Sequence, residues 1–365
     1  MTVSGRLNPP AVQYDLYLDW LRGLAAISVL VTHVRSGFFV QWSDLDLASH
    51  NAINYLLFLL TRLGRESVIV FFVLSGYLVG GQAWLAFRSR RYSLSEYLVA
   101  RISRLWVVVI PALLLTGLLD FLNGEWSESR NGWQPFLVNL FFLQDILGNT
   151  YGSNGPFWSL SYEWWFYVLC GFALEVAARP GIVALSILAA SGTLLALQCP
   201  AILLMMPLWL AGVLVRTLPV ANTPKPMAVG LSLAALCAAL LVSTTRLDWL
   251  GDYIVAAGVA ALLYFLRTLR QPKDSGLSIG AQLAAFSFSL YALHFPLNKL
   301  LLSIVVPHRV SHAGPVEWLQ CCGLAVLEIS VCWLFYRVFE RHTPLVRKAL
   351  RGLVSDQPKS TRMPA

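Results

Sequence analysis

The sequence predicts an all-α fold, a polytopic membrane helical bundle of about ten transmembrane helices. Of the 365 residues, 57% are hydrophobic and only 13% are charged, about half the charged share of a soluble domain. The mean hydropathy is +0.64. The apolar residues form separate runs close to the length that a helix needs to cross a bilayer, and Lys and Arg gather between alternate runs.

The predicted spans follow one another along most of the chain. They are 18–38, 67–87, 105–122, 158–177, 182–198, 201–215, 227–244, 251–267, 281–304 and 315–337. Two further apolar pieces, 53–63 and 135–147, are too short to span, and the second is a candidate re-entrant segment. The chain therefore divides into an N-terminal segment at 1–17, a membrane domain at 18–337 and a basic tail at 338–365.

The positive charges predict how the bundle is oriented. If both termini are cytoplasmic, most of the 27 basic residues fall on the inner side, as the positive-inside rule requires. The net charge of +8 then reflects topology and contact with membrane lipid, and nucleic acid is not an expected partner. The six Cys have no paired spacing, so neither a metal site nor a disulfide framework is predicted.

The first span carries ionisable residues within its apolar body. Arg22 and His33 are three helical turns apart, so they lie near one face, roughly 16 Å apart along the axis. Asp19 precedes Arg22 by one turn, within reach of a local ion pair. Ionisable groups inside a bilayer indicate a functional site. The alternative is that Asp19 and Arg22 mark the headgroup boundary, with Arg22 extending toward water.

In the predicted orientation, three polar side chains reach a similar depth in the outer half of the membrane. They are His33, His294 in the ninth span and Glu163 near the start of the fourth. Histidine accepts protons near neutral pH, and a carboxylate can orient it. The alternatives are that His294 hydrogen-bonds within a helix kinked by Pro296, and that Glu163 is an interfacial charge among tryptophans.

The inner side offers a different chemistry. Arg101 and Arg104 lie one turn apart at the start of the third span, after a segment that is also rich in arginine. Arginine binds phosphate groups bidentately, although anchoring to anionic lipid is the alternative. Ser75 precedes Gly76, a pair more typical of close helix packing than of a nucleophile. Neither a P-loop nor a dinucleotide-binding fingerprint is present.

Together these stretches resemble the acyltransferase-3 family of integral membrane acyltransferases, over about Tyr17 to Arg347. One departure from the family pattern is Ile69, where many members carry an acidic residue. The order and spacing of six motifs carry the resemblance: Leu18-Asp19-Trp20-Leu21-Arg22-Gly23 followed by His33, Arg65 followed by FFVLSGYL, Arg101-Ile-Ser-Arg104, FWSLSYEWWFY, SFSLYALHFP, and Phe339-Glu340-Arg341.

The resemblance implies transfer from a cytoplasmic acyl-CoA, most often acetyl-CoA, to a sugar hydroxyl of an envelope glycan, exopolysaccharide or glycolipid. It implies the bacterial inner membrane, proteins of polysaccharide biosynthesis as possible partners, and no metal. It makes His33 the catalytic candidate and carries Glu163 over as a motif residue. From its predicted position, Glu163 is the second catalytic candidate, which would hold the acceptor or support His33. The donor-binding candidates are Arg22, Arg101 and Arg104, and the remaining candidates for substrate binding or motif roles are Asp19, Arg65, Ser75 and His294.

A second hypothesis is a transporter or flippase for a lipid-linked sugar, with the buried His and Arg lining its path. It predicts substrate movement without consumption of acyl-CoA. The sequence shows no internal repeat, which weakens a transporter built from inverted halves.

Overall fold

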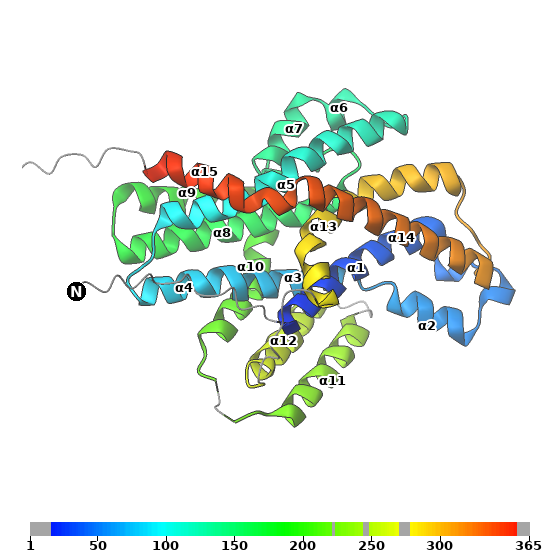
Figure 1. The fold of residues 1–365 in the computed structure, drawn as a ribbon, viewed down its shortest axis with the longest axis horizontal. Coiled ribbons are helices and arrows are strands. Elements are labelled where there is room, and N and C mark those ends of the chain that lie inside the picture. Colours follow the sequence, from blue (N-terminus) through cyan, green and yellow to red (C-terminus); the bar gives the residue numbers. More distant parts are fainter. Residues whose placement is uncertain (1–15, 221–222, 244–247, 270–277, 356–365) are drawn as a thin grey trace, which may run out of the picture.

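The computed structural model describes residues 16–220, 223–243, 248–269 and 278–355. The predicted N-terminal segment at 1–17 lies almost entirely outside the described residues, as does the end of the predicted tail. The described part is helical, with isolated bridges but no named strand among its elements, and the predicted helical bundle is confirmed (Figure 1). Its helices are α1 (Leu16–Phe38), α2 (Ala52–Leu60), α3 (Gly64–Ser75), α4 (Gly81–Arg88), α5 (Leu94–Leu122), α6 (Glu128–Asn131), α7 (Trp133–Leu140), α8 (Trp158–Ala178), α9 (Ile182–Gln198), α10 (Pro200–Thr217), α11 (Pro226–Ser243), α12 (Asp248–Leu266), α13 (Ile279–Val305), α14 (Pro315–Val338) and α15 (Thr343–Ser355).

Seven helical runs among the described residues are long and apolar enough to cross a membrane. Two further helices, α1 with 23 residues and α8 with 21, are long enough but contain more polar residues. The apolar helix α9 has 17 residues. These three helices together with the seven runs account for the ten predicted spans. The seven runs are Ala52–Arg88, Leu94–Leu122, Pro200–Thr217, Pro226–Ser243, Trp249–Leu266, Ile279–Val305 and Pro315–Leu353.

The helix of the third span begins earlier than predicted. Helix α5 begins at Leu94, well before the predicted start at residue 105, and Arg101 and Arg104 therefore lie within a helix. Ser93 caps this helix, since its hydroxyl accepts from the backbone N–H of Glu96, a standard way to satisfy a free helix end. Hydropathy marks only the apolar part of a helix, so it missed this polar first part.

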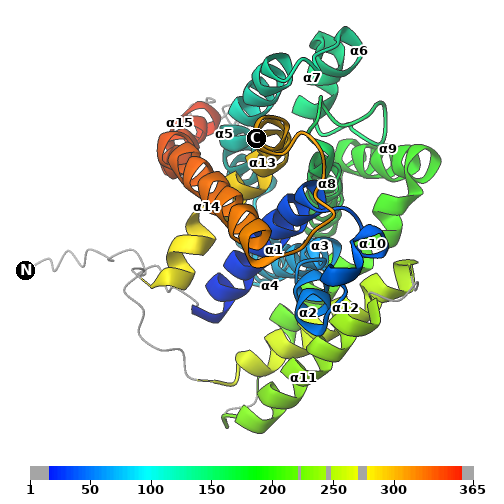
Figure 2. The same ribbon diagram turned by 90° about the vertical axis from the view of Figure 1, so that its right-hand side faces the viewer.

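The described part of the predicted tail is also structured. The helix α15 packs on α5, and the two lie side by side in Figures 1 and 2. An ion pair of 2.7 Å joins Arg351 on α15 to Glu96 on α5. The half-length apolar piece at 135–147 does not form one continuous helix. It holds most of the short helix α7, followed by irregular chain.

The helix α1 lies near the middle of the bundle, packed against α13, α3 and α14 (Figure 2). Gly23 makes a close approach possible, since a Cβ there would lie 2.6 Å from the Cβ of Leu283 on α13. Arg22 and His33 on α1 are partly buried in this packing. Their side chains can therefore act only in spaces between α1 and its neighbouring helices.

Close packing of α3 on α10 fixes the position of Ser75. A Cβ on Gly212 would lie 2.6 Å from the backbone nitrogen of Tyr77 and closer still to the carbonyl oxygen of Val73. A Cβ on Gly76 would likewise overlap the backbone carbonyl of Trp209. The predicted close packing is thus confirmed for Gly76, and a π-helical turn, a feature frequent at functional sites, follows at Gly76–Gly80.

Gly212→Ala tests this contact. We expect a lower apparent melting temperature in detergent, because the added methyl group meets backbone atoms that cannot rotate away, and overpacking typically costs about 1–3 kcal/mol. Gly323→Ala on α14 is the control, since nothing lies within 4 Å of a Cβ there. Equal melting temperatures for the two variants would contradict the contact.

Candidate functional site

A cavity of about 300 Å³ is bordered by four arginines from three helices. We call it the arginine cavity. Arg22 comes from α1, Arg101 and Arg104 from α5, and Arg347 from α15. The structure thus brings together the three arginines that the sequence singled out and adds a fourth. Its other polar lining residues are Ser75, Gln82, Ser159, Glu163, Tyr167, Ser287 and Tyr291.

The charges of the α5 and α15 arginines are poorly offset. In the described part of the chain, no carboxylate forms an ion pair with Arg101, Arg104 or Arg347. The guanidinium of Arg101 lies 5.8 Å from the ring centres of Tyr97 and Tyr167, and its Nε is buried without a hydrogen-bond partner. Guanidinium groups arranged in this way form a binding site for an anion.

Glu163 is held at the wall of the arginine cavity by a chain of hydrogen bonds. The indole N–H of Trp209 donates to the hydroxyl of Ser75 over 3.1 Å. The Ser75 hydroxyl lies 2.9 Å from that of Tyr167, which donates to Oε1 of Glu163. Because Tyr167 gives its only proton to the carboxylate, Ser75 must donate to Tyr167. The chain therefore orients the side chain of Glu163 at the cavity wall.

A second cavity, of about 420 Å³, is lined by His33. We call it the histidine cavity. Polar groups from α1, α13 and the chain after each surround it, among them Gln41 and Asn298. The side-chain oxygen of Asn298 is buried without a hydrogen-bond partner, so the wall offers an acceptor to a ligand that carries hydroxyl groups. The cationic lining residues are Arg35, Lys299 and Arg309.

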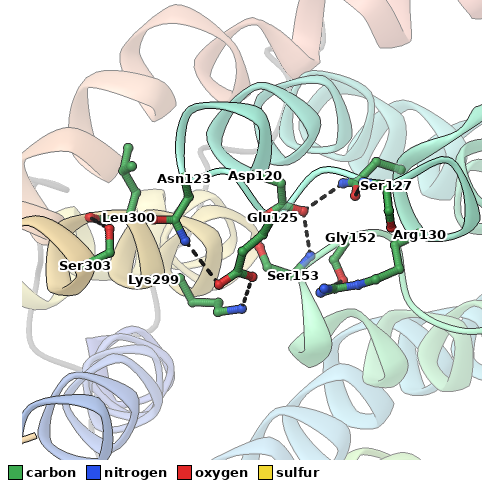
Figure 3. Close-up of polar contacts among 11 residues, drawn as sticks. Asp120, Asn123, Glu125, Ser127, Arg130, Gly152, Ser153, Lys299, Leu300 and Ser303 are labelled. Atoms are coloured by element: carbon green, nitrogen blue, oxygen red, sulfur yellow. Dashed lines mark hydrogen bonds and ion pairs between the residues drawn. The ribbon is translucent and has the colours of Figure 1, made fainter. Parts of the chain in front are cut away.

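The charge of Lys299 is already used within the protein. Figure 3 shows its ion pair with Glu125, which also accepts from the side-chain amide of Asn123 over 3.2 Å. In the same view, Asp120 accepts from the backbone N–H of Ser153 over 2.8 Å. These contacts fix the loop after α5 against α13 and against the segment before α8.

His294 lies between the two cavities, fully buried. Its Nδ1 is 2.8 Å from the carbonyl oxygen of Tyr291 and 3.1 Å from that of Leu290. Carbonyl oxygens only accept, so Nδ1 carries the proton and Nε2 bears a lone pair in the neutral ring. That Nε2 is buried without a partner, and the ring centre of His33 is 5.2 Å from that of His294.

The alternative explanation of His294 through Pro296 is only partly right. Pro296 has no N–H and so frees the carbonyl of Ala292, but the side-chain amide of Asn154 occupies that carbonyl over 2.9 Å. His294 instead contacts the carbonyls of Tyr291 and Leu290. These contacts use only Nδ1 of His294, and Nε2 is left available to accept a hydrogen bond.

The sequence was wrong to group Glu163 with the two histidines. Glu163 lines the arginine cavity, His33 lines the histidine cavity, and among the described residues the two linings have no member in common. Helix α8 begins inside the protein, since Ser159 and Ser161 are buried and the preceding Asn154 is fully buried. Glu163 therefore belongs to a helix whose first turn is surrounded by protein, and its side chain lines the arginine cavity.

Arg65 and Asp19 do not line either cavity. Arg65 on α3 forms a bidentate ion pair with Asp252 on α12, with distances of 3.0 and 2.7 Å. Asp19 interacts electrostatically with Arg22, as do Glu163 and Glu340. Ile69, the departure from the family pattern, is buried in the core.

Sequence reasoning missed Tyr167, Asn298 and Arg347. Tyr167 follows Glu163 by one helical turn, so helix periodicity offered a signal for it. Asn298 follows His294 by one turn in the same way. Arg347 carried no such signal, because only the packing of α15 on α5 brings it to the cavity.

A backbone strap closes one rim of the histidine cavity. The N–H of Val40 donates to the carbonyl of Val310, and the N–H of Val310 donates to the carbonyl of Phe38. Beyond these bonds, His312 and Asp46 form an exposed ion pair of 2.8 Å. Val40 and the neighbouring Arg309 both line the cavity, so the strap helps to set its width.

No cluster of three or more His, Cys, Asp or Glu is placed to hold a metal ion in the residues that the structure describes. All six cysteines are free.

Comparisons with known proteins agree with the motifs. A family model described as an acyltransferase domain matches residues 15–337. Acyltransferase MdmB of Streptomyces mycarofaciens is 28% identical over 164 residues, which cover 44% of this chain and 39% of that protein. The match thus spans well under half of that relative. No solved structure matches the chain.

The ion pair at the rim predicts a pH dependence. Asp46 holds the pKa of His312 above its ordinary 6.5 by hydrogen bonding and by charge, and hydrogen bonds from Ser49 and His312 hold the pKa of Asp46 below its ordinary 3.8. The pair is therefore fully stabilising between these two ordinary values. It weakens as pH rises through the pKa of His312 or falls through that of Asp46.

Hydrogen–deuterium exchange of residues 40–49 checks this, after correction for the intrinsic pH dependence of exchange. We expect protection to fall as the pH rises above 6.5 in the native protein and to lose this pH dependence in His312→Gln. The exposed His308→Gln is the control. An unchanged pH profile in His312→Gln would contradict a role for the pair in holding the rim.

Proposed function

The chain belongs to the acyltransferase-3 family and is a membrane acyltransferase, and we propose that it moves an acyl group from cytoplasmic acyl-CoA to a sugar hydroxyl of an envelope glycan or glycolipid. The observation that carries this proposal is the arginine cavity, where Arg101, Arg104 and Arg347 form no ion pair with a described carboxylate, together with a second cavity lined by His33 and by an unpartnered Asn298 oxygen.

The donor fits the arginine cavity by charge and by size. Coenzyme A carries a pyrophosphate and a 3′-phosphate, and guanidinium groups bind both bidentately. A cavity of about 300 Å³ suits the narrow pantetheine arm and its thioester. The nucleotide then stays at the mouth, beside Arg101, Arg104 and Arg347. Glu163 acts on the donor side in this arrangement, where its carboxylate can accept from a pantetheine amide N–H.

The acceptor fits the histidine cavity. Its unpartnered Asn298 oxygen, together with Gln41 and nearby serine hydroxyls, matches the many hydroxyl groups of a sugar. Arg309 at the rim would favour an acceptor that also carries a phosphate or carboxylate. With the donor on the cytoplasmic side, only the small acyl group has to cross the layer between the cavities.

Transfer requires a new bond to the acyl carbon, the transfer of one proton, and the loss of the C–S bond. The acceptor oxygen attacks the thioester carbonyl carbon, its proton passes to His33, and the C–S bond breaks to release CoA as a thiolate. The thiolate takes up the proton from His33. His294 supports this step because its Nε2 can accept a hydrogen bond from a protonated neighbour in a site where water is scarce.

An acyl-His33 intermediate is the alternative route. Here His33 attacks the thioester first, and the acceptor oxygen then attacks the acyl-imidazole. Both routes need the acyl carbon to reach His33 past Tyr291 and His294. This layer must therefore open during transfer.

A transporter of a lipid-linked sugar is the rival function. Family membership favours the enzyme, since the shared domain is an acyltransferase domain. Incubating membranes with labelled acetyl-CoA separates the two functions. The enzyme gives base-labile label on a glycan, whereas a transporter moves the glycan and leaves acetyl-CoA intact.

His33→Ala should abolish the labelling, by at least about a hundredfold, because the proton acceptor or acyl carrier is lost. The exposed His308→Ala controls for loss of any histidine. Both variants should remain folded in the membrane. Normal labelling in His33→Ala would remove His33 from the reaction.

Tyr167→Phe should weaken the action of Glu163, because it removes a hydrogen bond to a carboxylate. Such bonds are worth about 1.5–3 kcal/mol, so we expect kcat/KM for acyl-CoA to fall about tenfold or more. Tyr97→Phe is the matched control, since Tyr97 also lies beside Arg101 but donates to the backbone carbonyl of Tyr167. Equal effects of the two changes would argue against a specific role of the Ser75–Tyr167–Glu163 chain.

A further inference from the structure

The helix α15 lies beyond the residues matched by the family model, yet it contributes to the arginine cavity. We propose that α15 is part of the donor site and that Arg347 binds the phosphate of coenzyme A most distant from the thioester, the 3′-phosphate. This inference rests on the proposed acyl-CoA donor.

The position of α15 is fixed at both ends. The buried Glu340, just before it, accepts from the backbone N–H of Ser289 over 3.0 Å and from its hydroxyl over 2.6 Å. Toward its other end, Arg351 pairs with Glu96 on α5. The start of α15 is thus held against α13 and its later part against α5, so Arg347 is presented by a rigid element.

Arg347 is aimed at the cavity by contacts with α5. Its Nε donates to the hydroxyl of Ser103 over 3.3 Å, and its Nη2 donates to the carbonyl of Ala100 over 3.4 Å. Both partners are neutral. They orient the guanidinium without neutralising its charge, and they lie on the same stretch of α5 as Arg101 and Arg104.

The like charges around Arg347 point to an anionic ligand. Arg347 interacts repulsively with Arg101, Arg104 and Arg351, and the attraction of Glu96 is the smallest of these interactions. Glu340 attracts Arg104, but no described carboxylate forms an ion pair with Arg101, Arg104 or Arg347. Bringing three guanidinium groups together is unfavourable unless a negative group offsets them. A phosphate that accepts several charge-assisted hydrogen bonds does this.

The location of α15 selects the phosphate. Arg22 lies on α1, which is packed in the middle of the bundle. The helix α15 packs chiefly on α5, at the edge of the bundle. A thioester that reaches toward Arg22 and Glu163 leaves the opposite end of the donor at this edge. In coenzyme A that end is the adenosine with its 3′-phosphate.

The three cations of α15 provide their own controls. Arg347 and Arg351 are four residues apart and share a face toward α5, whereas Lys348 is exposed on another face. Arg347→Ala and Lys348→Ala therefore remove the same charge from the same helix. Only the first removes a group from the cavity.

The test compares the binding of coenzyme A with that of 3′-dephospho-coenzyme A. The full-length protein is placed in nanodiscs of phosphatidylcholine, so that no anionic lipid competes for the cations. We expect the native protein to prefer coenzyme A by about tenfold. Arg347→Ala should lose this preference while keeping its affinity for the dephospho form, Lys348→Ala should behave as the native protein, and Arg347→Lys should retain part of the preference.

Each other outcome overturns the inference. Equal affinity of the native protein for both ligands would leave the donor intact but remove the 3′-phosphate from Arg347. An equal loss for both ligands in Arg347→Ala would assign the residue a structural role, and the same loss in Lys348→Ala would point to general surface charge. Failure of the native protein to bind either ligand would reject the proposed donor itself.

Discussion

The structure depends on gathering positive charge inside an apolar bundle. Guanidinium groups from α1, α5 and α15 converge on one cavity, and carboxylates offset them only in part. Charges at membrane depth are unfavourable unless protein, water or a ligand surrounds them. The close helix contacts at Gly23, Gly76 and Gly212 keep the surrounding helices in place, and a binding space remains between the cationic side chains.

The two cavities are separate and differ in chemistry. Cations line one side, whereas an imidazole and an unpartnered amide oxygen line the other. His294 forms ring contacts both with His33, which lines the histidine cavity, and with Tyr291, which lines the arginine cavity. In the function that we propose, a bulky charged donor and a hydroxyl-bearing acceptor occupy different cavities, and only a small acyl group passes between them.

Rigidity is distributed unevenly around the site. The arginine cavity has walls tied by the Trp209–Ser75–Tyr167–Glu163 chain and by the contacts of Glu340 with Ser289. The histidine cavity has a rim of loop segments joined by a few backbone bonds and one exposed ion pair. Exposed pairs contribute little stability, so the rim is the part of the site best suited to open for a large acceptor.

The sequence by itself determined the class of fold, the approximate spans and the residues with chemical potential. Hydropathy reports how apolar each stretch is, and helix periodicity reports which side chains share a face, so Arg22, Arg101 and Arg104 were found from local pattern alone. The grouping of Glu163 with the histidines was wrong because hydropathy does not encode which cavity a side chain faces, whereas packing places Glu163 at the arginine cavity and His33 at the histidine cavity.

Only the tertiary structure decided which side chains meet. The contact between His33 and His294, the two cavities and the docking of α15 on α5 all join residues far apart in the chain. Such contacts depend on helix tilt, rotation and side-chain packing, which hydropathy does not encode. Arg347 is the plainest case, because it lies in a polar segment of no evident function until packing brings it beside Arg101 and Arg104.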